Sequence, residues 1–187
     1  MSITINELKG GLGLKIDNEI YVVLVVTHVK PGKGSAFVRV KIRNIKTDQV
    51  LERTFKSSEK LDEADLEERR LQNLYDGGNV IKFMDLSSYE EVEIPKTIIG
   101  DDINFLQENM EIIGICYKEK FLKVILPNFI IASVTQADPG LKGDTAKSGS
   151  KPVTIDTGAV VQAPLFIGVD DKIRIDTRSG EYVERMK

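Results

Sequence analysis

The sequence predicts an all-β protein made of several small domains, and three observations support this. Runs of β-branched and aromatic residues recur along all 187 residues, separated by turns rich in Gly, Pro, Asn and Asp. These runs are short, and a chain of this length has room for two or three compact cores. Signals for helices are few. We therefore expect small β-barrels rather than one large core.

A long β-hairpin dominates the first segment. Residues 20–29, IYVVLVVTHV, predict a strand, and the Pro-Gly-Lys-Gly sequence at 31–34 predicts a tight turn after it. In the next strand, residues 37–44, apolar side chains alternate with basic ones, which places three positive charges on one face. These basic residues are Arg39, Lys41 and Arg43. A turn at 46–48 and a strand at 49–57 complete a small antiparallel barrel.

The middle segment is largely β with one ambiguous stretch. Residues 61–75, LDEADLEERRLQNLY, favour a helix by propensity. Strands are predicted where apolar runs recur further along, with a short helix between them. The strands fall in 80–86, 90–99 and the two runs joined through 118–120, and the helix falls around 104–108.

The third segment begins after Pro127, where the strand FIIASV starts at Phe129. Residues 137–151, rich in Gly and Ser, predict an exposed loop. Four further strands follow, separated by Gly or Asp turns, and predict a five-stranded, partly open barrel. Their sequences are VTIDT, AVVQAPLFI, KIRIDT and EYVERM.

Composition narrows the class of protein. No apolar run approaches the roughly 20 residues that span a bilayer, and the N-terminus has no export signal, so a cytoplasmic protein without membrane association is expected. Cys116 is the only cysteine, which excludes an internal disulfide. Together with the single His28 it leaves little material for a zinc site, and no metal is expected. We interpret Cys116 as a core residue and His28 as structural.

Charge is distributed unevenly along the chain. Residues 1–60 hold 11 Lys or Arg against 6 Asp or Glu, a net +5. Residues 61–128 hold 7 against 15, a net -8, and residues 129–187 are balanced at 8 against 8. Clustered cations attract phosphate, so the first segment is the predicted place for RNA contact. A surface that merely keeps the protein soluble is the alternative.

The turn at Lys33 is the most informative motif, because a lysine flanked by Gly32 and Gly34 cannot pack a core. The stretch fails the Walker pattern, since Gly34 follows the lysine where Ser or Thr is needed. It also fails the dinucleotide pattern, because Phe37 stands at the third glycine. On turn chemistry alone, an ordinary hairpin with an incidental lysine remains the alternative.

Enzyme chemistry has little support in the sequence. No Ser, His and acid grouping or carboxylate pair is evident. A nucleophilic Lys33 is the one enzymatic alternative, but a lysine becomes a nucleophile when burial or a nearby cation lowers its pKa, and a glycine-flanked tip offers no burial. Aromatic residues make up 6% and Trp is absent, which weighs against a general single-strand binder.

Three signatures in order along the chain resemble bacterial elongation factor P over nearly its whole length. They are HVKPGKGSAFVRVKIRN at 28–44, PGLKGDTAKSGSKP at 139–152, and TGAVVQAPLFI followed by KIRIDTRSGEY within 157–182. The resemblance implies an SH3-like barrel and two OB-type barrels in an L-shaped, tRNA-like arrangement. It implies domains at 1–64, 65–127 and 128–187, and a strand over 66–75 in place of the helix.

The resemblance also implies a non-enzymatic translation factor without cofactor or metal, expected to be a monomer. Such a factor binds both ribosomal subunits beside peptidyl-tRNA at stalled consecutive prolines. Lys33 matches the tip lysine that a modifying enzyme usually enlarges and that reaches the tRNA acceptor end. A generic structured-RNA-binding protein of the same fold is the alternative function.

The implied site residues fall into three groups. The tip loop comprises Pro31, Gly32, Gly34 and Ser35 around Lys33. The residues expected at RNA around the acceptor end are Lys30, Arg39, Lys41 and Arg43. Those expected near the small subunit and in the C-terminal tail are Gly143, Asp144, Thr145, Tyr182 and Arg185. Two departures from the family are visible. Ser35 stands where relatives often have Gln or Ala, and Asp170 stands where a turn glycine is common. Asp tolerates the left-handed conformation of such a turn.

Overall fold

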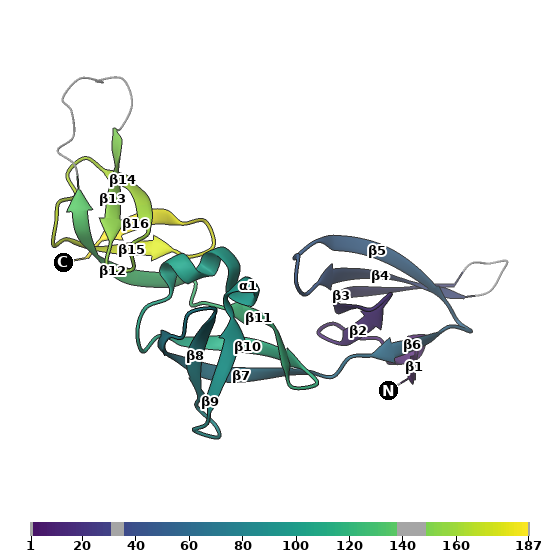
Figure 1. Cartoon of the computed structure of the whole chain (residues 1–187). Helices are drawn as coiled ribbons and strands as arrows, with labels where there is room; N and C mark the ends of the chain where they lie inside the picture. Colours follow the sequence, from purple (N-terminus) through teal and green to yellow (C-terminus); the bar gives the residue numbers. More distant parts are fainter. Residues whose placement is uncertain (1, 31–35, 138–148, 187) are drawn as a thin grey trace. The chain divides into compact units, whose positions relative to one another are not determined.

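The computed structural model describes residues 2–30, 36–137 and 149–186, and within them the chain is almost entirely β (Figure 1). Its strands form three antiparallel sheets, which confirms the predicted fold class. In the described part of the chain, no helix is long and apolar enough to cross a bilayer.

The first sheet has the strand order β1-β6-β2-β3-β4-β5. Its strands are β1 (Ser2–Thr4), β2 (Gly13–Ile16), β3 (Glu19–Val29), β4 (Phe37–Asn44), β5 (Val50–Lys56) and β6 (Lys60–Glu63), with a 3-10 turn η1 (Ile5–Glu7) after β1. Figure 1 shows β3, β4 and β5 as long neighbouring strands. The hairpin and the third strand lie within one residue of the ranges that alternation predicted.

The core of this sheet follows from alternation in β4. Val38, Val40 and Ile42 are at most 1% exposed and pack with Leu14, Val23 and Phe55 from other strands. Because successive side chains of a strand point to opposite faces, the residues between them are turned outward. Burial of one face therefore fixes the orientation of the basic face.

The second sheet has the order β11-β10-β7-β8-β9. Its elements are β7 (Leu66–Asp76), β8 (Val80–Asp85), β9 (Glu91–Pro95), α1 (Lys96–Ile99), η2 (Gly100–Phe105), β10 (Glu111–Tyr117) and β11 (Lys120–Ile125). The strand expected at 66–75 from resemblance is confirmed, and the helix predicted there from propensity is wrong. Leu71 and Asn73 point inward from β7 and are buried, which outweighs the helix propensity of the segment.

The helical turn of the middle segment lies earlier than predicted. Helical residues run from Lys96 to Phe105, whereas the sequence predicted a helix around 104–108. Gly100 adopts a φ of 63° and ends α1. The apolar residues Ile98 and Ile99 were predicted as the end of a strand because their spacing alone does not distinguish the two structures.

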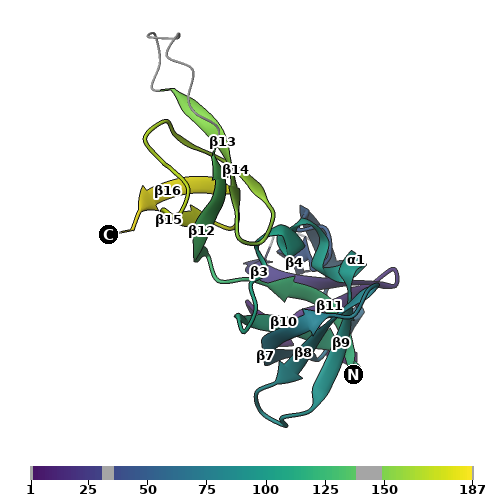
Figure 2. The same cartoon turned by 60° about the vertical axis from the view of Figure 1, so that its left-hand side comes forward.

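The third sheet has the order β14-β13-β12-β15-β16. Its strands are β12 (Phe129–Ala137), β13 (Ser150–Ile155), β14 (Val160–Pro164), β15 (Lys172–Asp176) and β16 (Glu181–Arg185). The first half of β12 pairs with β15 and its second half with β13, so one bent strand belongs to both sides of the barrel (Figure 2). All five predicted strands are present, although β14 ends at Pro164 rather than at Ile167.

Two predictions about single residues are confirmed. Cys116 is fully buried in β10. Asp170 has a φ of 67°, so this turn uses the left-handed conformation that was expected where the family has glycine. The chain as a whole divides into two compact units, Met1–Arg69 with Gly114–Lys123, and Arg70–Ile113 with Val124–Lys187.

Candidate functional site

The outer face of the three antiparallel strands β3, β4 and β5 carries the predicted basic residues. Arg39, Lys41 and Arg43 are all exposed and alternate with buried apolar residues of β4. Strand register places Thr27 and Thr54 beside Arg39, and Val25 and Glu52 beside Lys41. The three cations therefore form a row along the middle strand, and Glu52 is the one charged residue among these four register neighbours. We call Arg39, Lys41 and Arg43 the basic row.

Two residues of the basic row are paired with carboxylates. Arg39 Nε lies 3.3 Å from Glu52 Oε1 on the neighbouring strand. Arg43 Nε lies 3.9 Å from Asp48 Oδ1 in the β4–β5 turn, and Asp48 also accepts a hydrogen bond from Lys123 Nζ of β11. The side chains of both arginines remain about half exposed. The face is thus less positive than its lysines and arginines suggest.

Lys41 differs from its two neighbours. It lies opposite Glu52 in the strand register, yet Lys41 takes part in no ion pair with any residue that the structure describes. Lys30, which follows the end of β3, is also exposed. These two lysines can meet a phosphate without giving up a carboxylate partner.

The predicted tip lies outside the described residues. Pro31, Gly32, Lys33, Gly34 and Ser35 belong to the range that the structure leaves out. On either side of this range, Val29 of β3 pairs with Phe37 of β4. The chain therefore leaves and returns to the sheet at adjacent points. The segment that contains Lys33 joins β3 to β4, the strand that carries the basic row.

His28 lies on β3 and is exposed, opposite Val38 of β4. Because its side chain is exposed, His28 is not a core residue. Among the described residues, no group of three or more His, Cys, Asp or Glu side chains could hold a metal ion.

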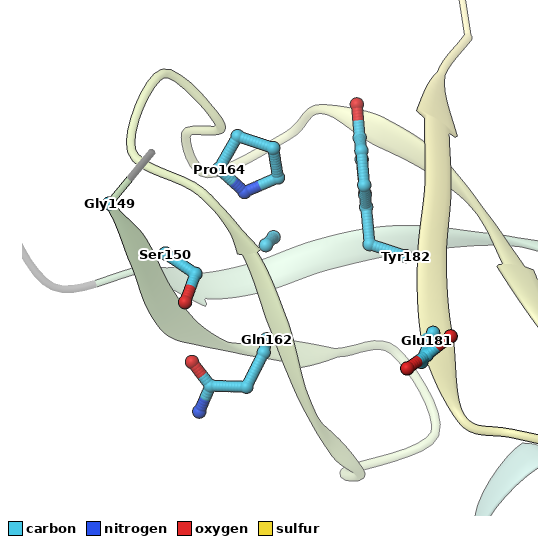
Figure 3. A pocket seen from close by; sticks show the side chains of 7 residues that line it. Gly149, Ser150, Gln162, Pro164, Glu181 and Tyr182 are labelled. Carbon is cyan, nitrogen blue, oxygen red and sulfur yellow. The ribbon is translucent and has the colours of Figure 1, made fainter. Parts of the chain in front are cut away.

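Another group of predicted site residues belongs to the third segment. Tyr182 of β16 is half-buried and packs against the core of the third sheet. Its ring and the Pro164 ring lie on either side of a shallow pocket of about 340 Å³ (Figure 3). The pocket lining also includes Gly149, Ser150, Gln162, Ala163 and Glu181. Gly143, Asp144 and Thr145 lie outside the described residues.

Arg185 is held within the third sheet. Its Nη2 lies 2.7 Å from Oδ1 of Asp171, a carboxylate whose side chain is only 15% exposed. Oδ2 of Asp171 also accepts a hydrogen bond from the Gly168 amide at 2.9 Å. Arg185 thus fastens the end of β16 to the turn before β15, a structural contact that sequence reasoning did not predict.

Sequence reasoning also missed the carboxylates that face the basic row. Glu52 could have been found from the alternation of β5, which puts it on the same face as Thr54. Asp48 could not, because its position depends on the turn. Asn44 Oδ1 accepts hydrogen bonds from the amides of Lys46 and Thr47, which holds the turn in place.

Three family models match successive parts of the chain. Residues 4–61 match the elongation factor P (EF-P) KOW-like domain, residues 66–124 match the elongation factor P (EF-P) OB domain, and residues 130–185 match elongation factor P, C-terminal. The three sheets are therefore one KOW-like domain and two OB-like barrels.

Relatives agree over the full length. Elongation factor P of Pelotomaculum thermopropionicum is 46% identical over 98% of this chain and 100% of its own length. Elongation factor P of Thermosynechococcus vestitus is 46% identical over 98% and 99%. A solved structure, eukaryotic translation initiation factor 5A from Methanococcus jannaschii, has a TM-score of 0.51 and 28% identity, covering 67% of this chain and 94% of its own. The chain belongs to the elongation factor P family of non-enzymatic, ribosome-binding translation factors.

Proposed function

We propose that this protein binds beside peptidyl-tRNA on ribosomes stalled at consecutive prolines and promotes peptide-bond formation there. The side chain of Lys33, enlarged by a modifying enzyme, positions the acceptor end of the tRNA. The observation that supports this most is the basic row on β4, because it lies on the strand that leads directly from the segment containing Lys33.

The physical reason lies in the reactant. Proline is conformationally restricted because its ring fixes φ, which makes it a poor partner in the peptidyl-transfer reaction. Holding the reacting groups in a productive geometry recovers rate through orientation, without acid-base chemistry by the factor. The ribosome remains the catalyst.

Contacts to the RNA backbone position a protein without reading sequence. We assign this role to Lys30, Arg39, Lys41 and Arg43, of which Lys30 and Lys41 are the more readily available. In the third segment, Gly143, Asp144 and Thr145 would contact the small subunit at the exit-site codon. Tyr182 offers a half-buried ring beside an open pocket, and Arg185 supports the strand on which Tyr182 lies.

The remaining features of the proposal concern organisation. We propose three domains at 1–64, 65–127 and 128–187, a monomer, and a cytoplasmic location. The acidic middle part of the chain, residues 61–128 with a net charge of -8, would act mainly as a spacer.

The decisive experiment measures formation of a Pro-Pro-Pro peptide on purified ribosomes. Native protein, a Lys33→Ala variant and unmodified recombinant protein are compared, with mass spectrometry of the tip peptide from the native protein. The proposal expects an acceleration by the native protein that Lys33→Ala loses. A mass addition on Lys33 would identify the modification.

A matched control separates the tip from general charge loss. Lys60→Ala removes an exposed lysine from β6 of the same sheet and should retain the acceleration. If native protein gives no acceleration, the proposal fails and a generic structured-RNA-binding role is favoured. That alternative is also favoured if binding does not require a ribosome that carries peptidyl-tRNA.

A further inference from the structure

We propose that Glu52 and Asp48 are specificity-determining residues of the basic row. By occupying Arg39 and Arg43 they weaken its attraction for RNA phosphates in general, so that tight binding requires the combined surface of the ribosome. This inference rests on the proposed role of the basic row in RNA contact, and it concerns residues on which that role itself does not depend.

Glu52 lies on the edge strand β5, level with the middle of the basic row. It is opposite Lys41 in the strand register and forms an ion pair with Arg39 at 3.3 Å. A phosphate that approaches either cation therefore meets a half-exposed carboxylate on the neighbouring strand. Attraction and repulsion between exposed charges both extend over roughly 8 Å at physiological ionic strength, so one carboxylate affects the whole row.

Asp48 is held beside Arg43 by the backbone. The Asp48 amide donates a hydrogen bond to the Asn44 carbonyl at 3.0 Å, and Asp48 adopts a left-handed φ of 56°. Its carboxylate lies between Arg43 and Lys123 and restrains both. Two carboxylates thus face the three cations of the basic row. Of these three cations, Lys41 is the one without an ion-pair partner among the described residues.

Stability does not explain these ion pairs. The side chains of Arg39 and Glu52 are 52% and 50% exposed, and those of Arg43 and Asp48 are 47% and 53% exposed. Pairs as exposed as these contribute little to folding, because solvent screens them and ordering two side chains costs entropy. Their main effect is on the electrostatic potential of the face. Neutralising either carboxylate should therefore leave the fold intact.

The effect on RNA binding can be estimated. Each phosphate contact releases counterions and makes the slope of log affinity against log salt more negative by about 0.9. Freeing one arginine should thus tighten binding to duplex RNA roughly five- to tenfold at about 0.1 M salt. Freeing both should give the product of the two gains if the sites act independently.

The test compares full-length wild type with Glu52→Gln, Asp48→Asn and the double variant. Binding to a fluorescein-labelled RNA duplex of unrelated sequence is measured by fluorescence anisotropy over a salt series. The proposal expects higher affinity and a steeper salt slope for each variant. Asn tolerates the left-handed conformation at position 48, and the melting temperature of each variant reports whether it is folded.

Glu111→Gln is the matched control. Glu111 is a similarly exposed carboxylate, paired with Arg70 at 2.6 Å in the second sheet, and its neutralisation changes the net charge by the same amount. It should bind the duplex as wild type does. Equal gains for Glu52→Gln and Glu111→Gln would reduce the effect to net charge and overturn the proposal, as would unchanged affinity in Glu52→Gln.

A second measurement connects the inference to the ribosome. Unlabelled duplex RNA is added as a competitor to the Pro-Pro-Pro assay, and the double variant should be inhibited at a lower competitor concentration than wild type. Equal inhibition would contradict the proposal. Duplex binding is measured without ribosomes, so failure of the proposed translation function, seen as no acceleration by native protein, is distinguishable from failure of this inference.

Discussion

The backbone of Gly13 lies directly against that of Ala64. The Ala64 amide donates a hydrogen bond to the Gly13 carbonyl at 2.9 Å, and a Cβ added at Gly13 would lie 2.2 Å from the Ala64 carbonyl oxygen. No residue with a Cβ can occupy this position unless the backbone moves. This close contact packs β2 against residues 64–65, which join β6 to β7. It lies in the compact unit that also carries the basic row.

Gly13→Ala should therefore destabilise this unit by about 1–3 kcal/mol, the usual cost of overpacking. The measurement is urea unfolding monitored by circular dichroism. Gly10→Ala is the control, because a Cβ at Gly10 would meet its nearest neighbour, the Leu24 carbonyl oxygen, at 3.4 Å. Equal stability of Gly13→Ala and wild type would show that the backbone at Ala64 can yield.

The left-handed turn at Asp170 gives a second prediction. The Asp170 amide donates to the Val134 carbonyl at 2.9 Å, so the turn is fixed by β12. Asp170→Ala should destabilise by about 1 kcal/mol, because a Cβ without a polar side chain is disfavoured at this φ. Asp170→Gly should be at least as stable as Asp170→Ala, since glycine has no such penalty. Thermal unfolding of both variants checks the order, and the reverse order would contradict it.

The lowered pKa of Asp176 predicts that the stability of the fold depends on pH. Arg178 Nε donates a hydrogen bond to Asp176 Oδ1 at 2.9 Å, and Arg178 Nη2 donates one to Asp176 Oδ2 at 2.5 Å. These hydrogen bonds are the main cause that lowers the pKa of Asp176 from 3.8 to about 2. A depressed pKa in the folded state means that the carboxylate stabilises the fold above about pH 4. This contribution is lost as the pH falls from about 4 to about 2.

Arg178→Gln should accordingly raise the pKa of Asp176 toward 3.8, because the main hydrogen bonds to the carboxylate are lost. The measurement is a carboxyl-carbon NMR titration of Asp176. Arg174→Gln is the control, since Arg174 pairs with Glu184 at 3.0 Å instead. If Asp176 titrates alike in wild type and Arg178→Gln, the attributed cause is wrong.

The basic row gives a prediction for ribosome binding. Lys41→Gln should weaken binding to purified ribosomes roughly five- to tenfold at about 0.1 M salt and reduce the salt slope by about 1, because one phosphate contact is lost. Binding is measured by co-sedimentation over a salt series. Lys60→Gln removes the same charge from an exposed position on β6 and should bind as wild type does. Equal losses for both variants would deny Lys41 a specific role.

Much of the fold was predictable because alternation is a local property. In β4, buried and exposed residues follow one another as the sequence indicates, and the predicted range of 37–44 matches the strand. Local propensity was wrong at β7, where a charged, leucine-rich segment favours a helix, although the resemblance predicted the strand. There β7 lies between β10 and β8, so backbone pairing on both sides and burial of Leu71 decide for the strand.

In the candidate site, too, some features follow from the sequence and others depend on the tertiary structure. The sequence by itself determined which residues are cations, that Arg39, Lys41 and Arg43 share a face, and that a glycine-flanked Lys33 joins the two strands of the hairpin. Only the tertiary structure decided that Arg39 meets Glu52 and that Arg43 and Lys123 share Asp48. The reason is that a side chain's position along its own strand follows from the period of two residues. Its neighbours across the sheet depend instead on register, turn geometry and contacts between segments distant in the chain.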